Sequence, residues 1–581
     1  MSARVVGQYR WLPAGVWEIE AAPEVMIRIK RLFPRVDTTC RGTVTVTGTD
    51  EVARDLEMIV GRHPMRASLQ DRRRLQEMAA QHRRGEAAVA RLISGETIPT
   101  GDGPGWVQPT KPLRHYQRIA RDLAWASGGA LIADDLGAGK TFTSLALLEQ
   151  PEARPAVAVT LTGVMGQQWR EQLAEFYPML TSIEVQTGEM HSLKVRGRVA
   201  DLIVMNYAKL DKWQYRLKGL VRTVIFDETQ ELRRCDSNRY KAAVNLAYAA
   251  QFRVGITNTP VFNYGGSEIY NIIDALRPGV LGSKEEFARE WCNTSSLHIK
   301  SMVADPAALN SYLKAHGLLL RRTLEEVGIE LPPLFPIEQP VPSDPEVLAE
   351  IEGNAAELAR MILDQSANPR ERWSAAGQFD WMMRQQTGIA KAPFVADFVK
   401  MVLQSQQRVI LLGWHHACHR IWMEQLADYD PMLYTGEQTN AQKARSIAAF
   451  KNGTCRVLIM SVRSGAGVDG LQQVASTLVF GELDWSPGPH KQAMGRLHRP
   501  GQTVPTMAYF CVTDSGSDPI MVETLDLKQM QADGILDPLN LDVASQQAQL
   551  EPHIERYDQI KRIAANYLAG IDQQSEQRRS A

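Results

Sequence analysis

Residues 131–141 read LIADDLGAGKT, a short apolar strand followed by a glycine-rich turn and a Lys-Thr pair. Gly137 and Gly139 let the backbone curl so that several N–H groups face one anion. At the end of this turn, Lys140 is placed to reach the β- and γ-phosphates of a nucleotide, and the Thr141 hydroxyl to ligate Mg²⁺. The helix expected next points the positive end of its dipole at the same anion. The stretch therefore predicts a phosphate-binding loop.

Two other positions of this loop bear on the prediction. Ala138 lies between the two glycines and is included among the expected nucleotide-binding residues. Asp134 stands where the common phosphate-loop motif has glycine, so the general motif is only partly met. More distant segments must therefore decide the class of nucleotide-binding protein.

An apolar strand that ends in two adjacent carboxylates follows in residues 223–230 (TVIFDETQ). A buried strand that delivers Asp-Glu at its carboxyl end is typical of the second half of an NTPase site. We expect Asp227 to hold Mg²⁺ through its water shell. We expect Glu228 to orient and deprotonate the attacking water.

Two arginines lie three residues apart in residues 492–502 (QAMGRLHRPGQ). Arg496 and Arg499 share one face if this stretch is helical. Such side chains suit a γ-phosphate whose negative charge shifts during transfer. The alternative is a structural ion pair with Glu482 or Asp484, but the surrounding motif favours catalysis.

Together these segments resemble the motifs of superfamily-two helicase-like ATPases and, within them, of the Swi/Snf-type DNA translocases. That family has aspartate at the position of Asp134, and its last motif has the form found in residues 492–502. Gln117, in LRHYQ before the phosphate loop, resembles the family's adenine-reading glutamine. Trp169 and its neighbours resemble the DNA-contacting motif after the first crossover. The resemblance covers roughly residues 105–530, in the family's order.

Two more segments resemble the family, and one position and one segment depart from it. Residues 254–260 (VGITNTP), with Asn263 after them, resemble the motif that senses the γ-phosphate, and residues 320–323 (LRRT) resemble the closing segment of the first lobe. Gln230 stands where the family more often has histidine; it can relay hydrogen bonds at the nucleotide but cannot carry charge. Residues 461–472 depart clearly from the family's fifth motif.

Continuous apolar runs alternate with helical patterns twice along the chain. Runs without polar alternation are typical of parallel strands covered on both faces. They occur at residues 130–133, 156–160, 202–205, 223–226 and 253–256, and again at 408–413, 432–434, 456–460, 478–481 and 507–512. The sequence therefore predicts an α/β protein with two RecA-like parallel-sheet lobes in tandem, at residues 105–335 and 396–535. Ligands of such sheets bind beyond the carboxyl ends of the strands.

The remaining segments are predicted from shorter patterns. Residues 1–104 predict a small α/β module with strands at 15–20 and 43–47, helices at 23–33 and 50–60, and an arginine-rich helical stretch after them. The arginines either contact nucleic-acid phosphates or form a solvated face. The segment from Pro332 to Pro345 is proline-rich and predicts a linker, and residues 336–395 as a whole predict this linker followed by a helical protrusion. The protrusion either contacts DNA or partners or serves as a packing spacer. Residues 536–581 predict a helical tail that docks on the second lobe.

Histidines crowd residues 415–419 (HHACH). His415 and His419 have the spacing that suits zinc on a helix. The stretch directly follows an expected strand, where structural or exposed histidines are favoured. We therefore expect no zinc there, and metal binding only at Thr141 and Asp227.

Composition limits the partners. A chain of 581 residues is too long for one core, and its formal net charge of −1 excludes a global basic field. Any nucleic-acid contact must therefore come from a locally basic groove. The six cysteines are scattered, which fits a reducing compartment. No uninterrupted apolar stretch reaches the length of a membrane span, so we expect a protein of the cytoplasm, in a bacterium or a viral host, or of the nucleus in a eukaryote. We also expect the protein to be a monomer.

The resemblance implies an enzyme that hydrolyses ATP with Mg²⁺ and moves on double-stranded or branched DNA without reading its sequence. The arginines of the second lobe would then complete a site begun by the phosphate loop. Two alternatives remain open at this point. One is a strand-separating or fork-remodelling and annealing helicase of repair or recombination. The other is a remodeller of RNA polymerase or another protein on nucleic acid, with the N-terminal module binding the protein partner.

Overall fold

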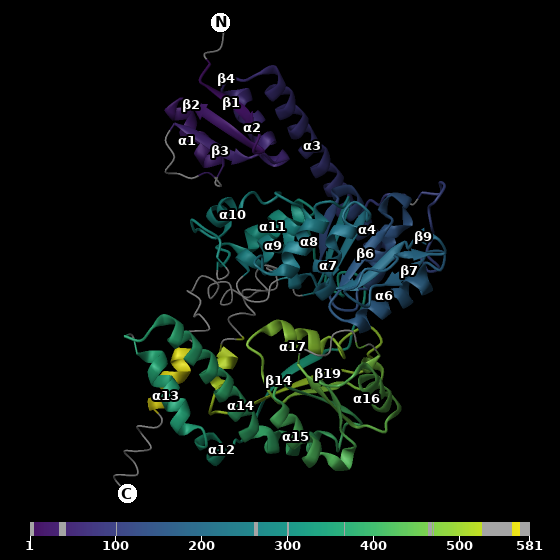
Figure 1. Ribbon diagram of the computed structural model, residues 1–581, viewed down its shortest axis with the longest axis vertical. Coiled ribbons are helices and arrows are strands. Elements are labelled where there is room, and N and C mark those ends of the chain that lie inside the picture. The colour runs from purple at the N-terminus through teal and green to yellow at the C-terminus, as the bar shows by residue number, and fades with distance from the viewer. Residues whose placement is uncertain are drawn as a thin grey trace. The chain divides into compact units, whose positions relative to one another are not determined.

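The computed structural model describes residues 5–33, 36, 42–99, 101–258, 260, 265–298, 301–364, 366–462, 468, 470–523, 525 and 560–569. These residues form two compact units, of which the first ends at Gly328 and the second begins at Ile329. Each unit contains a parallel sheet with helices packed on it (Figure 1). Within the described ranges, no helix is both long and apolar enough to cross a membrane.

The N-terminal module of the first unit is a small sheet packed against helices. Its strand order is β3-β2-β1-β4. The strands are β1 (Gly7–Leu12), β2 (Val16–Ala21), β3 (Thr43–Thr47) and β4 (Met65–Arg66), and the helices are α1 (Pro23–Leu32), α2 (Asp50–Arg62) and α3 (Leu69–Ile93). The alternation of Thr and Val in β3 buries Val44 and Val46 and exposes Thr43 and Thr45. The two strands and two helices predicted here are confirmed to within a few residues.

The first lobe contains a seven-stranded parallel sheet in the order β13-β5-β12-β11-β6-β10-β7. Its strands are β5 (Gly129–Ile132), β6 (Ala156–Thr160), β7 (Ser182–Glu184), β10 (Leu202–Asn206), β11 (Thr223–Asp227), β12 (Phe252–Ile256) and β13 (Leu319–Leu320). A separate hairpin joins β8 (Lys194–Val195) and β9 (Arg198–Val199). The helices are α4 (His115–Ser127), α5 (Lys140–Leu145), α6 (Gly163–Phe176), α7 (Tyr207–Leu217), α8 (Asn238–Ala247), α9 (Gly266–Leu276), α10 (Lys284–Trp291) and α11 (Pro306–Ala315).

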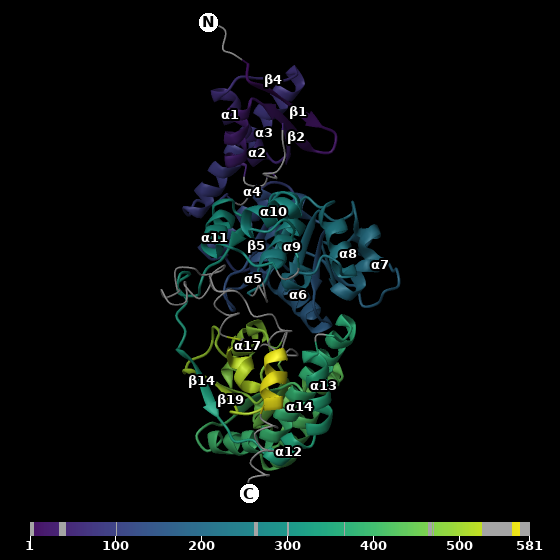
Figure 2. The same cartoon turned by 90° about the vertical axis from the view of Figure 1, so that its left-hand side faces the viewer.

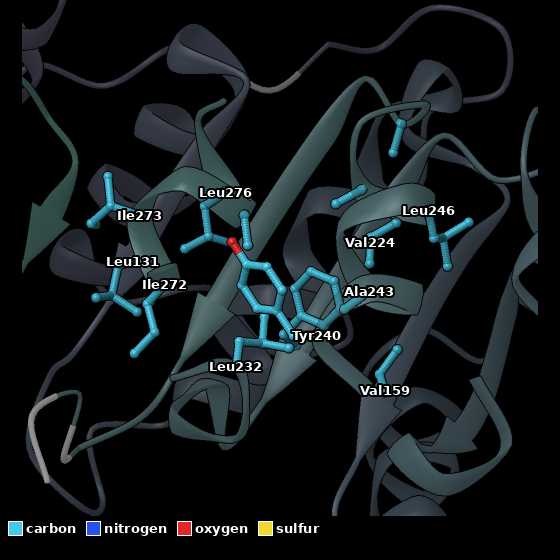
Figure 3. Packing of buried hydrophobic residues seen from close by; sticks show 14 of the residues in the cluster. Leu131, Val159, Val224, Leu232, Tyr240, Ala243, Leu246, Ile272, Ile273 and Leu276 are labelled. Atoms are coloured by element: carbon cyan, nitrogen blue, oxygen red, sulfur yellow. The ribbon is translucent and has the colours of Figure 1, made fainter. Parts of the chain in front are cut away.

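Both faces of this sheet are buried, which explains why its strands lack polar alternation. Successive residues of β11 point to opposite faces, so Val224 joins the core under α7, α8 and α9, whereas Ile225 joins the core under α4, α5 and α6. Figure 3 shows the first of these cores, which contains Val224 of β11, Tyr240 of α8 and Leu276 of α9. Helices on both faces leave the carboxyl edge of the sheet as the place where loops gather.

The second unit contains a six-stranded parallel sheet in the order β14-β19-β18-β15-β17-β16. Its strands are β14 (Leu334–Pro340), β15 (Val409–Gly413), β16 (Met432–Tyr434), β17 (Val457–Ser461), β18 (Thr477–Phe480) and β19 (Thr506–Val512). Its helices are α12 (Pro345–Ala349), α13 (Glu352–Leu363), α14 (Pro369–Val402), α15 (His416–Gln425), α16 (Asn440–Asn452) and α17 (Pro487–Met494). The prediction of an α/β protein with two parallel-sheet lobes is confirmed.

The predicted proline-rich linker is wrong over part of its length, because Leu334–Pro340 forms strand β14 and pairs with β19 along all of it. β14 is an edge strand, and the N–H of Val341 donates inward to Val512. Pro336 and Pro340 have the opposite parity, so their missing N–H groups fall on the outer side, where the ladder loses nothing.

The helices α12, α13 and α14 follow β14, and the last of them is long. α14 is a 34-residue helix, so the predicted boundary at residue 395 lies within it. Val395 and Val399 of α14 pack in the core of the second lobe against β15. The tail returns to this unit as a helical segment at residues 560–569, yellow in Figure 2, which buries Ile560 and Ala564 in the second core. Docking of the tail on the second lobe is thus confirmed for the described part.

Candidate nucleotide-binding and catalytic site

The turn after β5 has the backbone that its glycines predict. Gly137 and Gly139 adopt φ values of 90° and 78°, in the left-handed region where a Cβ is costly. A Cβ on Gly139 would also come within 2.7 Å of the Gln117 amide nitrogen. α5 begins directly at Lys140, with Thr141 half-buried in its first turn. The loop therefore presents the N-terminal N–H groups of α5, which have no acceptor within the helix and suit an anion.

The Lys140 amine lies over the loop. Its Nζ donates to the backbone oxygens of Asp134 at 2.7 Å and Asp135 at 3.0 Å. Burial lowers the pKa of Lys140 to about 8, opposed by the negative charges of Asp134 and Glu228. A bound phosphate would replace the two carbonyls with stronger, charged acceptors and favour the ammonium form.

The carboxylate of Asp134 is held by an arginine from the far end of the lobe. Arg322 donates from Nε and Nη2 to the two Asp134 oxygens at 3.0 Å and 2.6 Å, and its Nη1 donates to the Tyr116 carbonyl at 2.7 Å. Beside it, Arg321 pairs with Asp135 at 2.6 Å. Asp134 is thus placed behind the loop, where its side chain fixes the backbone and only its carbonyl meets Lys140.

Gln117 lies next to the same loop, at the start of α4. Its Oε1 accepts from the Arg114 N–H at 3.0 Å, and its Nε2 donates to the Ala138 carbonyl at 3.4 Å. The Tyr116 hydroxyl donates to that carbonyl as well, at 2.7 Å. The predicted adenine-reading residue therefore has its amide against the phosphate loop, and α4 fixes the direction of Ala138.

The acidic pair stands at the carboxyl end of β11. Asp227 accepts a hydrogen bond on Oδ2 from Trp169 Nε1 at 2.8 Å, and on Oδ1 from the Glu228 N–H at 3.0 Å. The Tyr207 hydroxyl donates to the Asp227 carbonyl at 2.9 Å. Burial and the charge of Glu228 raise the pKa of Asp227, while the Trp169 bond and Lys140 act to lower it. The structure thus brings Lys140 and this pair into one electrostatic site.

Trp169, which lies in the stretch that resembles a DNA-contacting motif, is joined to the acidic pair. Its indole is buried at 1% exposure and bonded to Asp227, 58 residues further along the chain. The presence of a tryptophan could have indicated such a bond, since a buried indole N–H requires an acceptor.

A hydrogen-bonded relay runs from Glu228 to the neighbouring strand. Glu228 has a left-handed backbone, with φ of 54°. Gln230 donates from Nε2 to the Glu228 carboxylate, and its Oε1 accepts from the Thr257 hydroxyl at 2.6 Å. Glutamine thus links the acidic pair to the segment after β12 without charge. Asn263, which belongs to the same predicted motif, lies outside the described residues.

The arginine pair of the second lobe lies in turns, and the premise of a helix there is wrong. α17 ends at Met494, and Gly495 and Pro500 explain why, since glycine weakens a helix and proline disfavours helical backbone before it. Between the half-buried Arg496 and Arg499, Leu497 is fully buried and anchors the turn in the core.

The histidine-rich stretch surrounds a buried carboxylate. Glu482 accepts from the N–H groups of Trp414 and His415 at 2.7 Å and 2.9 Å, and from His415 Nδ1 at 2.6 Å. Burial alone would raise the pKa of Glu482, but these hydrogen bonds prevail and lower it. His419 is buried as well, and burial lowers its pKa. Hydrogen bonding thus accounts for the position of His415.

Comparison with known proteins gives two family matches. The chain matches the model of the SNF2-related domain at residues 60–336 and that of the helicase conserved C-terminal domain at residues 393–501. It is similar to the mouse "DNA annealing helicase and endonuclease ZRANB3", at 27% identity over 69% of this chain and 38% of that protein. The chain therefore spans about two fifths of the length of this relative.

Two further similarities cover more of the matched protein. The "Uncharacterized ATP-dependent helicase YqhH" of Bacillus subtilis is 23% identical over 70% of this chain and 76% of that protein. Among solved structures, the Sulfolobus solfataricus SWI2/SNF2 ATPase core in complex with dsDNA matches at 20% identity and a TM-score of 0.35, over 78% of this chain and 97% of that one.

Proposed function

Because the chain belongs to the SNF2-type helicase-like ATPases, we propose that it uses ATP hydrolysis to move along double-stranded DNA and to remodel DNA or DNA–protein complexes. The observation that carries this proposal is the convergence of Lys140, Asp227 and Glu228 at the carboxyl edge of one parallel sheet. In such sheets that edge is where nucleotides bind.

Each residue of the proposed site has a chemical role. The N–H groups of Gly137, Ala138 and Gly139 surround the phosphates, and Lys140 donates to the β- and γ-phosphates. The donor set for Mg²⁺ consists of the Thr141 hydroxyl and the Asp227 carboxylate, and hard oxygen ligands fit this ion. Mg²⁺ supplies charge neutralisation on the phosphates when bound.

Glu228 and the arginines act on the reacting groups in this proposal. Glu228 orients the attacking water and accepts its proton, with its carboxylate held by Gln230. Arg496 and Arg499 compensate the charge that shifts from the γ-phosphate during hydrolysis. Loss of either arginine should therefore lower kcat and leave nucleotide affinity less affected.

Movement on DNA follows from contacts with the phosphate backbone. Such contacts carry no base information, so we expect binding that is independent of sequence and weakens with salt. One relative is named as a DNA annealing helicase, and annealing of separated strands is the second candidate function. Duplex-stimulated hydrolysis supports the first, and hydrolysis stimulated more by forked than by plain duplex DNA supports the second.

The Lys140→Ala variant tests the site. We expect it to lose ATPase activity, because the phosphates lose their charged donor, and to keep its affinity for duplex DNA. Lys209→Ala is a matched control, since the Lys209 amine also donates to a backbone carbonyl, that of Val185 at 2.9 Å. ATP turnover that persists in Lys140→Ala would contradict the proposed site, and stimulation by RNA but not by duplex DNA would contradict the proposed substrate.

A further inference from the structure

Three potential metal ligands meet where α3 of the N-terminal module packs beside α11 of the first lobe. They are His82 and Glu86, one turn apart on α3, and His316, at the end of α11. His82 Nε2 lies 3.1 Å and His316 Nε2 lies 3.9 Å from Glu86 Oε1. Among the described residues, this is the group of three His, Cys, Asp or Glu side chains whose ligand atoms lie within 4.8 Å of one another.

The Nε2 atoms of both imidazoles in this cluster are buried and lack hydrogen bonds. Within the described part of the chain, neither His82 Nε2 nor His316 Nε2 has a hydrogen-bond partner, and the His82 side chain is only 10% exposed. Buried polar atoms of native proteins are otherwise paired. Two such nitrogens aimed at one carboxylate therefore point to a cation that belongs between them.

The tautomer of His316 supports a metal ion. Its Nδ1 lies 2.8 Å from the backbone oxygen of Tyr312 and donates to it, which leaves the lone pair on Nε2. In the neutral ring, a lone pair that faces the oxygens of Glu86 and of Glu51, the latter at 3.8 Å, is repelled unless a metal ion or a proton lies between them. A ring nitrogen bonded to a carbonyl while the other faces the ligand is also the usual arrangement of a metal-binding histidine.

We propose that His82, Glu86 and His316 bind a zinc ion that fastens the N-terminal module to the first lobe. Two imidazoles and one carboxylate are a donor set that zinc accepts. With bonds of about 2.0–2.1 Å and tetrahedral angles, ligand atoms lie about 3.3 Å apart. The separations of 3.1 Å and 3.9 Å bracket that value, so small side-chain rotations complete the site.

The charges around the cluster favour a divalent cation. Arg54 Nη1 donates to Glu86 Oε1 at 3.4 Å, but its Nε is paired with Asp55 at 2.8 Å. The carboxylates of Glu51 and Glu86 therefore leave the site net negative. The Tyr312 hydroxyl donates to Glu51 at 2.7 Å and holds that carboxylate beside His316.

The site lies on an interface that already joins the module to the lobe. Thr47 of β3 donates from its backbone N–H to Glu286 of α10 at 3.0 Å, and its hydroxyl donates to the same carboxylate. Zinc bound at a second point between the module and the lobe would stop the module from pivoting about that contact. The proposal stands on these residues alone and does not depend on the proposed DNA translocation.

The test is zinc binding by the full, tag-free chain after treatment with a chelator. Excess Mg²⁺ in the buffer occupies oxygen-rich sites and leaves imidazole sites open. We expect one tightly bound zinc per chain, a Co²⁺ form with the intense visible absorption of four-coordinate cobalt, and a higher unfolding temperature with zinc. His82→Ala and His316→Ala should each weaken binding by more than about a hundredfold, since loss of an outer partner alone costs 10–100-fold.

Two further variants make the outcome decisive. Glu86→Gln keeps the size of the side chain and removes the anionic ligand, so it should fold as the parent does in chelator yet gain no stability from zinc. His416→Ala removes an exposed histidine elsewhere and should bind zinc as the parent does. Absence of stoichiometric binding by the parent, or equal binding by Glu86→Gln and the parent, would overturn the proposal.

Discussion

Replacing Trp169 with phenylalanine removes the indole N–H that donates to Asp227 Oδ2 at 2.8 Å and keeps an aromatic ring in the core. A hydrogen bond to a charged group contributes about 1.5–3 kcal/mol. At 1.36 kcal/mol per decade, this corresponds to roughly one to two pKa units, or a tenfold to hundredfold effect. The bond acts to lower the pKa of Asp227, so its loss raises that pKa further.

The sign of the pH effect follows from which form binds Mg²⁺. In the proposed site the carboxylate is the Mg²⁺ ligand, so we expect activity to be lost as the pH falls through the pKa of Asp227, which burial together with Glu228 has already raised. In Trp169→Phe the acid limb of kcat/KM for ATP should therefore move to higher pH by roughly one to two units. At alkaline pH the variant should approach the parent.

Steady-state ATPase rates across the neutral pH range measure this shift. Trp213→Phe is the matched control, because Trp213 is equally buried and its Nε1 donates to the Thr187 carbonyl at 3.3 Å, away from the acidic pair. The unfolding temperatures of both variants show whether a lower activity results from weaker core packing or from the missing hydrogen bond. An unshifted acid limb in Trp169→Phe, or an equal shift in Trp213→Phe, would refute the reasoning.

Three other substitutions probe the rest of the site. Gly139→Ala forces a Cβ onto a left-handed backbone, at about 1–2 kcal/mol, so ATP affinity measured by calorimetry should fall about tenfold. Thr257→Val leaves the Gln230 carbonyl oxygen without its donor, at about 1–3 kcal/mol, and should lower DNA-stimulated kcat about tenfold at unchanged ATP affinity. Arg322→Ala leaves the Asp134 carboxylate buried and unpaired, which should lower the free energy of unfolding by about 3–5 kcal/mol in urea titrations.

The strands of both sheets could be predicted because their burial leaves a local trace. In β6, and in β11 as far as Phe226, every position is apolar or small, and such runs follow from two covered faces rather than from any single contact. The turn at Gly137 and Gly139 could also be predicted, because its left-handed backbone requires glycine at these two positions. These are features that a short window of sequence contains.

Features that depend on distant residues could not be predicted in this way. Prolines in residues 332–345 indicate a linker locally, and only the edge position beside β19 makes Pro336 and Pro340 compatible with a strand. Likewise, the spacing of Arg496 and Arg499 suits a helix, but a helix end depends on Gly495 and on the packing of its neighbours. The spacing of a motif predicts which residues act together. It does not predict the backbone conformation of those residues as readily.

The position of Asp134 shows how a departure from a motif can be explained by the fold. A carboxylate where glycine is usual would repel phosphate if it pointed into the loop. The order of the sheet places β13 directly beside β5, so Arg322, the second residue after β13, reaches the loop that follows β5 across 188 positions of sequence. Arg322 then binds both oxygens of Asp134 and also the Tyr116 carbonyl of α4. The aspartate thus joins the phosphate loop to the end of the lobe and to α4. A shift of either element would therefore move the loop that carries Lys140.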